Sequence, residues 1–121
     1  MSDARQYKIG LLGCGTVGGG LVELVNRNRS LIRERTGVDL TFTRILVRNL
    51  DRERPGVDRN LLTVHPEKVI NNGCDIVVEL IGGLEPARGF IRSALSRHKH
   101  VVTANKALLA LDGSSLPGGS G

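Results

Sequence analysis

A glycine-rich hexapeptide, residues 13–18, constrains this chain more than any other segment, because of what flanks it. Residues 7–12 are mostly apolar and predict a buried strand, whereas residues 17–32 carry apolar side chains at helical spacing. Between them, Gly13, Gly15 and Gly18 match the pattern G-x-G-x-x-G. A strand that passes through such a turn into a helix is typical of a dinucleotide-binding unit.

The three glycines of the motif have different expected tasks. Gly13 permits a tight turn out of the strand, Gly15 lets the backbone approach a pyrophosphate, and Gly18 lets the helix pack closely on the strand. The N-terminus of the helix offers N–H groups and a partial positive charge to phosphates. The alternative is a glycine-rich turn without a ligand, since the chain contains 16 glycines.

The rest of the chain alternates between strand and helix patterns. We expect strands at residues 40–47, 61–64, 75–80 and 101–103, and helices at residues 17–32, 66–71, from about residue 85, and at 106–111. Residues 49–60 are polar and predict an exposed loop. This alternation predicts a Rossmann-type doubly wound α/β fold, with a mainly parallel sheet and helices on both faces.

Two predicted helices carry apolar side chains expected to share a buried face. On the first helix, helical spacing puts near one face the apolar residues Val17, Leu21, Leu24, Val25 and Ile32, together with the polar Asn28. On the helix that starts near residue 85 they are Ala87, Phe90, Ile91, Ala94 and Leu95.

The length of 121 residues predicts one domain, over residues 1–111. Residues 112–121 are rich in glycine and serine and predict a flexible tail, either an engineered addition or a natural disordered terminus. The chain shows no signal peptide and no apolar run long enough to span a membrane, so we expect a cytoplasmic protein.

The net charge of +5 favours phosphorylated ligands. It does not favour nucleic acid, because the basic residues are scattered and no aromatic residues interleave with them for base stacking. Cys14 and Cys74 lie far apart without metal-ligand spacing, so we expect reduced thiols and no metal site.

The end of the second predicted strand bears on the choice of dinucleotide. NAD-binding units place an acidic residue there, whereas this chain has Arg48 and Asn49, with no carboxylate before Asp51. An arginine can pair with a 2′-phosphate, so NADP(H) is the expected cofactor and NAD(H) the alternative. Arg48 lies farther from the glycine motif than the usual ~20 residues, and the competing interpretation is a solvated loop residue.

Four segments together resemble the nucleotide-binding domain of homoserine dehydrogenase. They are residues 9–18, residues 47–49, residues 77–88 with the sequence E-L-I-G-G, and residues 100–110 with T-A-N-K-A-L-L-A. The likeness runs from about residue 7 to residue 111, and the last two segments are more specific than the glycine motif. The family reduces aspartate semialdehyde to homoserine with NAD(P)H, on the route to threonine and methionine.

The resemblance implies roles for individual residues. The pyrophosphate would be held by Gly13, Gly15, Thr16, Val17 and Gly18, and Arg48 would lie near the adenosine 2′ position. The nicotinamide half and its ribose would be approached by Ile81, Gly82, Thr103, Asn105 and Lys106. Lys106 is the candidate catalytic residue, because an ammonium can stabilise charge on a carbonyl oxygen or pass a proton. The competing interpretation is a surface lysine at a helix start.

The resemblance also implies partners. In the family a second lysine, the substrate carboxylates and a metal-ion site belong to a catalytic domain that follows, and the full enzyme is a homodimer. We therefore expect this chain to bind cofactor without turnover, and to bind neither nucleic acid nor membrane. The alternatives are a stand-alone nucleotide-binding regulatory module, the cofactor domain of another NAD(P)-dependent dehydrogenase, and a scaffold without a ligand.

Overall fold

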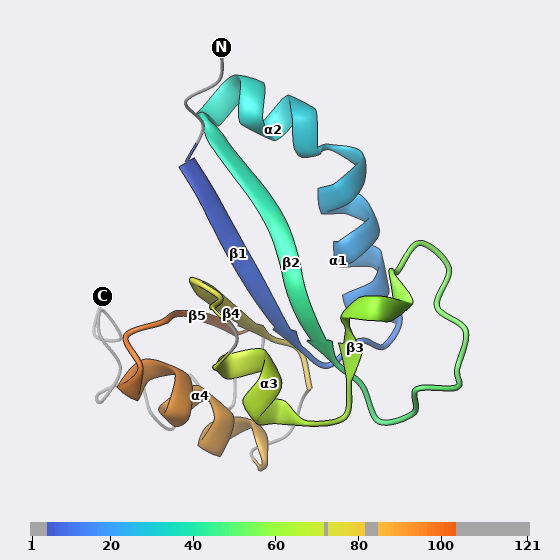
Figure 1. The fold of residues 1–121 in the computed structure, drawn as a ribbon, viewed down its shortest axis with the longest axis vertical. Helices are drawn as coiled ribbons and strands as arrows, with labels where there is room; N and C mark the ends of the chain where they lie inside the picture. Colours follow the sequence, from blue (N-terminus) through green and yellow to red (C-terminus); the bar gives the residue numbers. More distant parts are fainter. Residues whose placement is uncertain (1–4, 72, 82–84, 104–121) are drawn as a thin grey trace.

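The computed structural model describes residues 5–71, 73–81 and 85–103, whose strands form one parallel sheet (Figure 1). The strands are β1 (Arg5–Leu12), β2 (Val38–Leu46), β3 (Leu62–Thr63), β4 (Ile76–Glu79) and β5 (His100–Thr103). Their order is β3-β2-β1-β4-β5, and all four pairings are parallel. From β1 the chain builds outward first to one side and then to the other, which confirms the expected Rossmann-type doubly wound fold.

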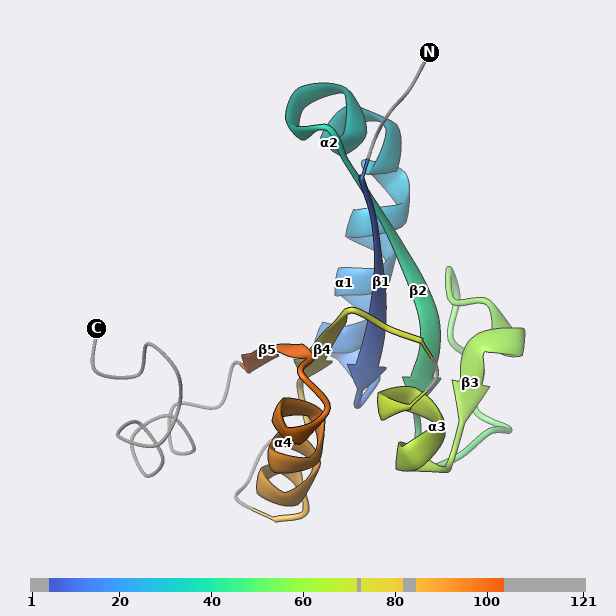
Figure 2. The same ribbon diagram turned by 60° about the vertical axis from the view of Figure 1, so that its left-hand side comes forward.

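Helices cover both faces of this sheet (Figure 2). They are α1 (Thr16–Arg27), α2 (Arg29–Thr36), α3 (Pro66–Ile70) and α4 (Ala87–Ser96), with a 3₁₀ turn at Arg59–Leu61. The first helix packs on one face and continues into α2, whereas α3 and α4 pack on the other face. Within the described ranges, none of these helices combines the length and the apolar character that a membrane crossing requires.

Alternation along β1 divides the core between the two faces. Ile9 and Leu11 belong to the cluster on the α1 side, together with Val22 and Val25. Leu12 points the other way and belongs to the cluster formed with α3 and α4. Because successive side chains of a strand point to opposite faces, a strand covered on both sides is apolar at nearly every position.

The prediction of one continuous helix over residues 17–32 is wrong, because the structure has two helices there that are separated at Asn28. That residue has φ −102° and ψ 12°, and its Nδ2 donates to the Leu24 carbonyl oxygen at 2.9 Å. An asparagine side chain competes with the backbone in this way and weakens a helix interior. The second helix then ends, as expected, at Gly37, which has φ 73°.

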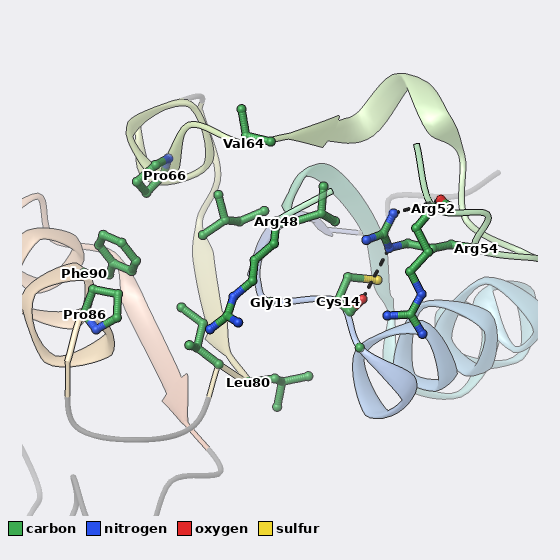
Figure 3. A pocket seen from close by; sticks show the side chains of 14 residues that line it. Gly13, Cys14, Arg48, Arg52, Arg54, Val64, Pro66, Leu80, Pro86 and Phe90 are labelled. Carbon is green, nitrogen blue, oxygen red and sulfur yellow. Dashed lines mark hydrogen bonds between the residues drawn. The ribbon is translucent and has the colours of Figure 1, made fainter. Parts of the chain in front are cut away.

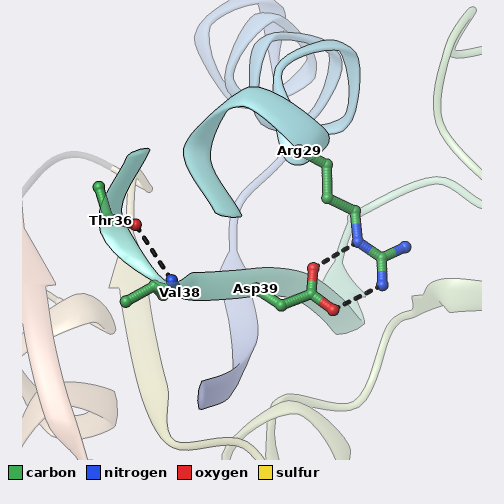
Figure 4. A network of polar contacts seen from close by, with 4 residues as sticks. All are labelled: Arg29, Thr36, Val38 and Asp39. Carbon is green, nitrogen blue, oxygen red and sulfur yellow. Dashed lines mark hydrogen bonds and ion pairs between the residues drawn. The ribbon is translucent and has the colours of Figure 1, made fainter. Parts of the chain in front are cut away.

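The break brings Arg29 over the start of β2 (Figure 4). The Arg29 guanidinium donates from Nε to Asp39 Oδ1 at 2.6 Å and from Nη2 to Oδ2 at 2.9 Å. Beside it, the Val38 amide donates to Thr36 Oγ1 at 3.1 Å. The hydrogen bond from Arg29 lowers the pKa of the buried Asp39 carboxyl below its ordinary value.

The predicted buried face of the first helix is also wrong in part. Val17 and Leu24 are 72% and 57% exposed, whereas Val22 and Val25 are buried against the sheet. For α4 the expected stripe is confirmed, since Ala87, Ile91 and Ala94 are buried. The helix expected at 106–111 and the tail at 112–121 lie outside the described residues.

Candidate nucleotide-binding site

A cavity of about 610 Å³ lies at the carboxyl edge of the sheet, where the ends of β1, β2 and β4 meet (Figure 3). Its lining residues are Gly13, Cys14, Gly15, Leu46, Val47, Arg48, Arg52, Arg54, Val64, Pro66, Leu80, Ile81, Pro86 and Phe90. The glycine motif, residues 47–48 and the residues that follow β4 therefore meet at one cavity. In parallel α/β sheets, ligands bind outside the carboxyl ends of the strands, at the point where the strand order reverses.

Two glycines of residues 13–18, which we call the glycine loop, fix the shape of the turn. Gly13 has φ 96°, a conformation that strains any residue with a side chain, and its amide donates to the Leu46 carbonyl oxygen at 3.2 Å. A Cβ atom on Gly18 would lie 2.7 Å from the Gly13 carbonyl oxygen. The expected turn and close-packing roles of these two residues are confirmed.

Gly15 differs from its neighbours in facing open space. A Cβ atom there would meet nothing within 4 Å. The residue is also the N-cap of α1, and no side chain forms a cap hydrogen bond at this helix end. Open space beside the backbone amides of a first helical turn, which also carry the positive end of the helix dipole, fits a pyrophosphate.

Arg48 lies two residues past the end of β2 and lines the same cavity with an exposed side chain. None of the described residues forms a hydrogen bond or an ion pair with its guanidinium. The described lining residues include three arginines and no acidic residue. This composition fits an anionic group beside Arg48, and none of those residues offers a carboxylate to a ribose 2′-hydroxyl.

Sequence reasoning missed Arg52 and Arg54, which it assigned to an exposed loop. Both line the cavity, opposite Pro86 and Phe90 (Figure 3). The signal in the sequence that could have identified them is the density of arginines after β2. We call residues 48–54 the arginine segment. Burial raises the pKa of the Cys14 thiol, and the charges of Arg54 and Arg52 oppose that rise.

A buried carboxylate links the ends of β4 and β5. Glu79 is fully buried, its Oε2 accepts a hydrogen bond from the Ile81 amide at 2.6 Å, and its Oε1 accepts one from the Thr103 hydroxyl. Register explains the second contact, because Glu79 and Thr103 are paired across the two strands. Sequence reasoning treated Glu79 as part of a strand and of the E-L-I-G-G segment, and it missed this link between Ile81 and Thr103, two predicted site residues.

The structure places only some of the predicted site residues. Gly13, Gly15, Arg48 and Ile81 line the cavity, and Thr103 reaches this edge through Glu79. Val17 lies in the first turn of α1 with an exposed side chain, and the side chain of Thr16 is not described. Gly18 packs against the Gly13 carbonyl oxygen, beneath the turn. Three further predicted residues lie outside the described ranges, namely Gly82, Asn105 and Lys106.

Comparison with known proteins decides the family. The family model for the homoserine dehydrogenase NAD-binding domain matches residues 13–116. The chain belongs to the homoserine dehydrogenase family. This confirms the resemblance found in the sequence and assigns the chain to the nicotinamide dinucleotide-binding domain of that family.

Individual homoserine dehydrogenases support the assignment. The enzyme of Bacillus subtilis is 38% identical over 114 residues, which are 93% of this chain and 26% of that protein. The crystal structure of the enzyme from Thiobacillus denitrificans matches with a TM-score of 0.86 and 44% identity, covering 95% of this chain and 27% of that one. A hyperthermophilic archaeal enzyme solved in complex with NADPH matches with a TM-score of 0.69, covering 89% of this chain and 38% of that one, and at 24% identity it shows the shared fold.

The chain thus spans about a quarter of the length of the first two homoserine dehydrogenases. The matched part is the dinucleotide-binding domain, and the remaining three quarters of those enzymes have no counterpart in it.

Proposed function

We propose that this chain supplies the NADP(H) site of an enzyme that interconverts aspartate semialdehyde and homoserine, on the cytoplasmic route to threonine and methionine. One observation carries the proposal: the open glycine loop and the unengaged guanidinium of Arg48 lie on the same cavity. A dinucleotide with a 2′-phosphate presents two anionic groups, and the cavity offers a separate binding group for each.

The preference for NADP(H) over NAD(H) rests on the end of β2. Arg48 can form two parallel hydrogen bonds to a phosphate through its planar guanidinium, an arrangement that also neutralises charge. Among the described residues that line the cavity none is acidic, so no carboxylate of that set would repel a 2′-phosphate. In this proposal Arg48 binds the 2′-phosphate, and the glycine loop binds the pyrophosphate.

The other predicted residues complete the proposal. Thr16 and Val17 extend the pyrophosphate contact, Ile81 and Gly82 line the nicotinamide half, and Thr103, Asn105 and Lys106 approach the nicotinamide ribose. Bound NADPH supplies the hydride. We propose Lys106 as the catalytic residue that stabilises charge on the carbonyl oxygen or passes a proton to it. The catalytic domain of a longer, homodimeric enzyme would bind the substrate.

The cofactor proposal is tested by titrating the chain with NADP⁺ and with NAD⁺ in a calorimeter. Arg48→Ala removes a charge-assisted contact to the 2′-phosphate, worth roughly 1.5–3 kcal/mol, so NADP⁺ should bind about 10- to 100-fold more weakly while NAD⁺ binding hardly changes. Arg35→Ala is the matched control, because it removes an equal charge from an exposed residue at the other end of β2. An unchanged NADP⁺/NAD⁺ affinity ratio in Arg48→Ala would contradict the assignment.

A second experiment tests the division between binding and turnover. The purified chain is mixed with NADPH and aspartate semialdehyde, and oxidation is followed by absorbance. We expect no oxidation, since substrate binding is proposed to lie in the catalytic domain. Semialdehyde-dependent oxidation by the chain alone would show that the substrate site lies within it.

A further inference from the structure

The guanidinium of Arg54 touches both of the loops that would hold the cofactor. Its Nε donates to the carbonyl oxygen of Cys14, in the glycine loop, at 3.4 Å. Its Nη1 donates to the carbonyl oxygens of Asn49 at 2.9 Å and Arg52 at 3.0 Å, both in the arginine segment. We propose that Arg54 is a positioning residue that holds the glycine loop and the arginine segment at a fixed distance from each other. This inference rests on the proposed NADP(H) site, in which the two segments bind the pyrophosphate and the 2′-phosphate.

The sheet ladder ends at the base of the two loops, with the Gly13 amide on the Leu46 carbonyl oxygen and the Val47 amide on that of Thr63. Cys14 and Val47 also pack in one buried apolar cluster. Among the described residues, the hydrogen bond from Arg54 to Cys14 is the one that crosses from the arginine segment to the glycine loop. The distance between the two anion sites therefore depends on this side chain.

The contact with Cys14 also sets the direction of a predicted phosphate donor. In a trans peptide the C=O and the following N–H point in opposite directions. Because Arg54 holds the Cys14 carbonyl, it also fixes where the Gly15 N–H points. The same contact directs the negative end of that carbonyl toward a cation rather than toward a phosphate.

Arg54 differs in this respect from the other two arginines of the cavity. No described residue engages the guanidinium of Arg48 or of Arg52, so both remain available to an anion. Arg54 is half-buried, and its donors already serve backbone oxygens on two loops (Figure 3). A planar fork can reach three oxygens in fixed directions, whereas the ammonium of a lysine acts as a point charge on a flexible stem.

The test compares Arg54→Lys with Arg54→Ala by calorimetric titration with NADP⁺ and NAD⁺. Arg54→Lys keeps the positive charge but loses the planar guanidinium. A positioning role therefore predicts that lysine does not restore the dinucleotide affinity that Arg54→Ala loses. We expect NADP⁺ to bind about tenfold more weakly to both variants, with a smaller loss for NAD⁺, because displacing the segment moves Arg48 as well. Hydrogen exchange without cofactor should speed up in residues 13–18 and 48–54 of Arg54→Lys.

Arg59→Lys is the matched control. Arg59 belongs to the same connection and donates to one backbone oxygen, that of Leu50, but it does not line the cavity. It should bind both dinucleotides as the wild type does. The inference is overturned if Arg54→Lys binds as the wild type, if it loses NADP⁺ and NAD⁺ affinity equally, or if its hydrogen exchange is unchanged. A wild-type chain that binds neither dinucleotide would instead refute the proposed function, and this inference with it.

Discussion

Replacing Gly18 with alanine puts a methyl group against the backbone where α1 passes the glycine loop. The new Cβ would lie 2.7 Å from the Gly13 carbonyl oxygen, 3.5 Å from its carbonyl carbon and 3.6 Å from Cys14 Cβ. Since the closest atom belongs to the backbone, no side-chain rotation relieves the contact. Either the helix or the turn must move by a few tenths of an ångström.

The size of the effect follows from two opposing contributions. Overpacking of this kind costs about 1–3 kcal/mol, and alanine regains about 0.5–1 kcal/mol of helix propensity over glycine. The net loss should be about 1–2 kcal/mol in the free energy of unfolding. Gly20→Ala isolates the second contribution, because a Cβ at Gly20 meets nothing within 4 Å, and it should stabilise the chain by about 0.5–1 kcal/mol.

Urea unfolding followed by circular dichroism measures both variants against the wild type. The midpoints should move in opposite directions, and the two variants should differ by about 2 kcal/mol. Thermal unfolding should show the same order, at roughly 4–8 °C per kcal/mol for a domain of this size. If Gly18→Ala and Gly20→Ala unfold at the same urea concentration, close approach is not the reason for a glycine at position 18.

Two further predictions concern buried acids. Because the hydrogen bond from Arg29 depresses the pKa of Asp39, the ion pair stabilises the fold at neutral pH and loses that contribution as the pH falls below about 4. The stability gap between wild type and Asp39→Asn, measured by urea unfolding, should therefore shrink from pH 7 to pH 3, and a constant gap would contradict this. Thr103→Val removes a hydroxyl donor from the buried Glu79 and should cost about 1–3 kcal/mol. Thr41→Val, whose hydroxyl makes no hydrogen bond among the described residues, should cost less, and equal losses would count against the role of Glu79.

The parallel, doubly wound sheet and the glycine turn could be predicted because local patterns determine them. Apolar runs such as that of β4 mark strands buried on both faces, and alternation with helices leaves few topologies. Gly13 and Gly18 were assigned correctly because a turn and a close approach each require a residue without a side chain. Such requirements depend on a few neighbouring residues.

The buried face of α1 could not be predicted because its apolar residues spread over about half of the helix circumference. Val17, Leu21, Val22, Leu24 and Val25 leave more than one choice of stripe, and packing against β2 selected Val22 and Val25. The break at Asn28 has a similar origin. A side-chain bond to the Leu24 carbonyl competes with the helix, and the sequence does not reveal which conformation the surrounding structure favours.

Arg52 and Arg54 of the arginine segment escaped prediction for a different reason. Loops carry no hydrophobic period, so polarity alone suggested solvent exposure for Arg52 and Arg54. The position of the Arg54 side chain depends on the carbonyl oxygens of Cys14 and Asn49, and since every residue has a carbonyl oxygen, no sequence pattern marks such a contact. The link from Glu79 to Thr103 is hidden in the same way, because it depends on the register of two strands far apart in the chain.

The nine residues of β2 separate the ion pair near the start of the strand from the arginine segment that follows its end. At ~3.3 Å per residue the strand is about 30 Å long, with Asp39 and Arg29 near its start and Arg48 just past its end. Effects of substitutions separated by more than about 10 Å usually add. Resistance to unfolding and choice of dinucleotide can therefore change independently, so a protein engineer could adjust one end of this strand without redesigning the other.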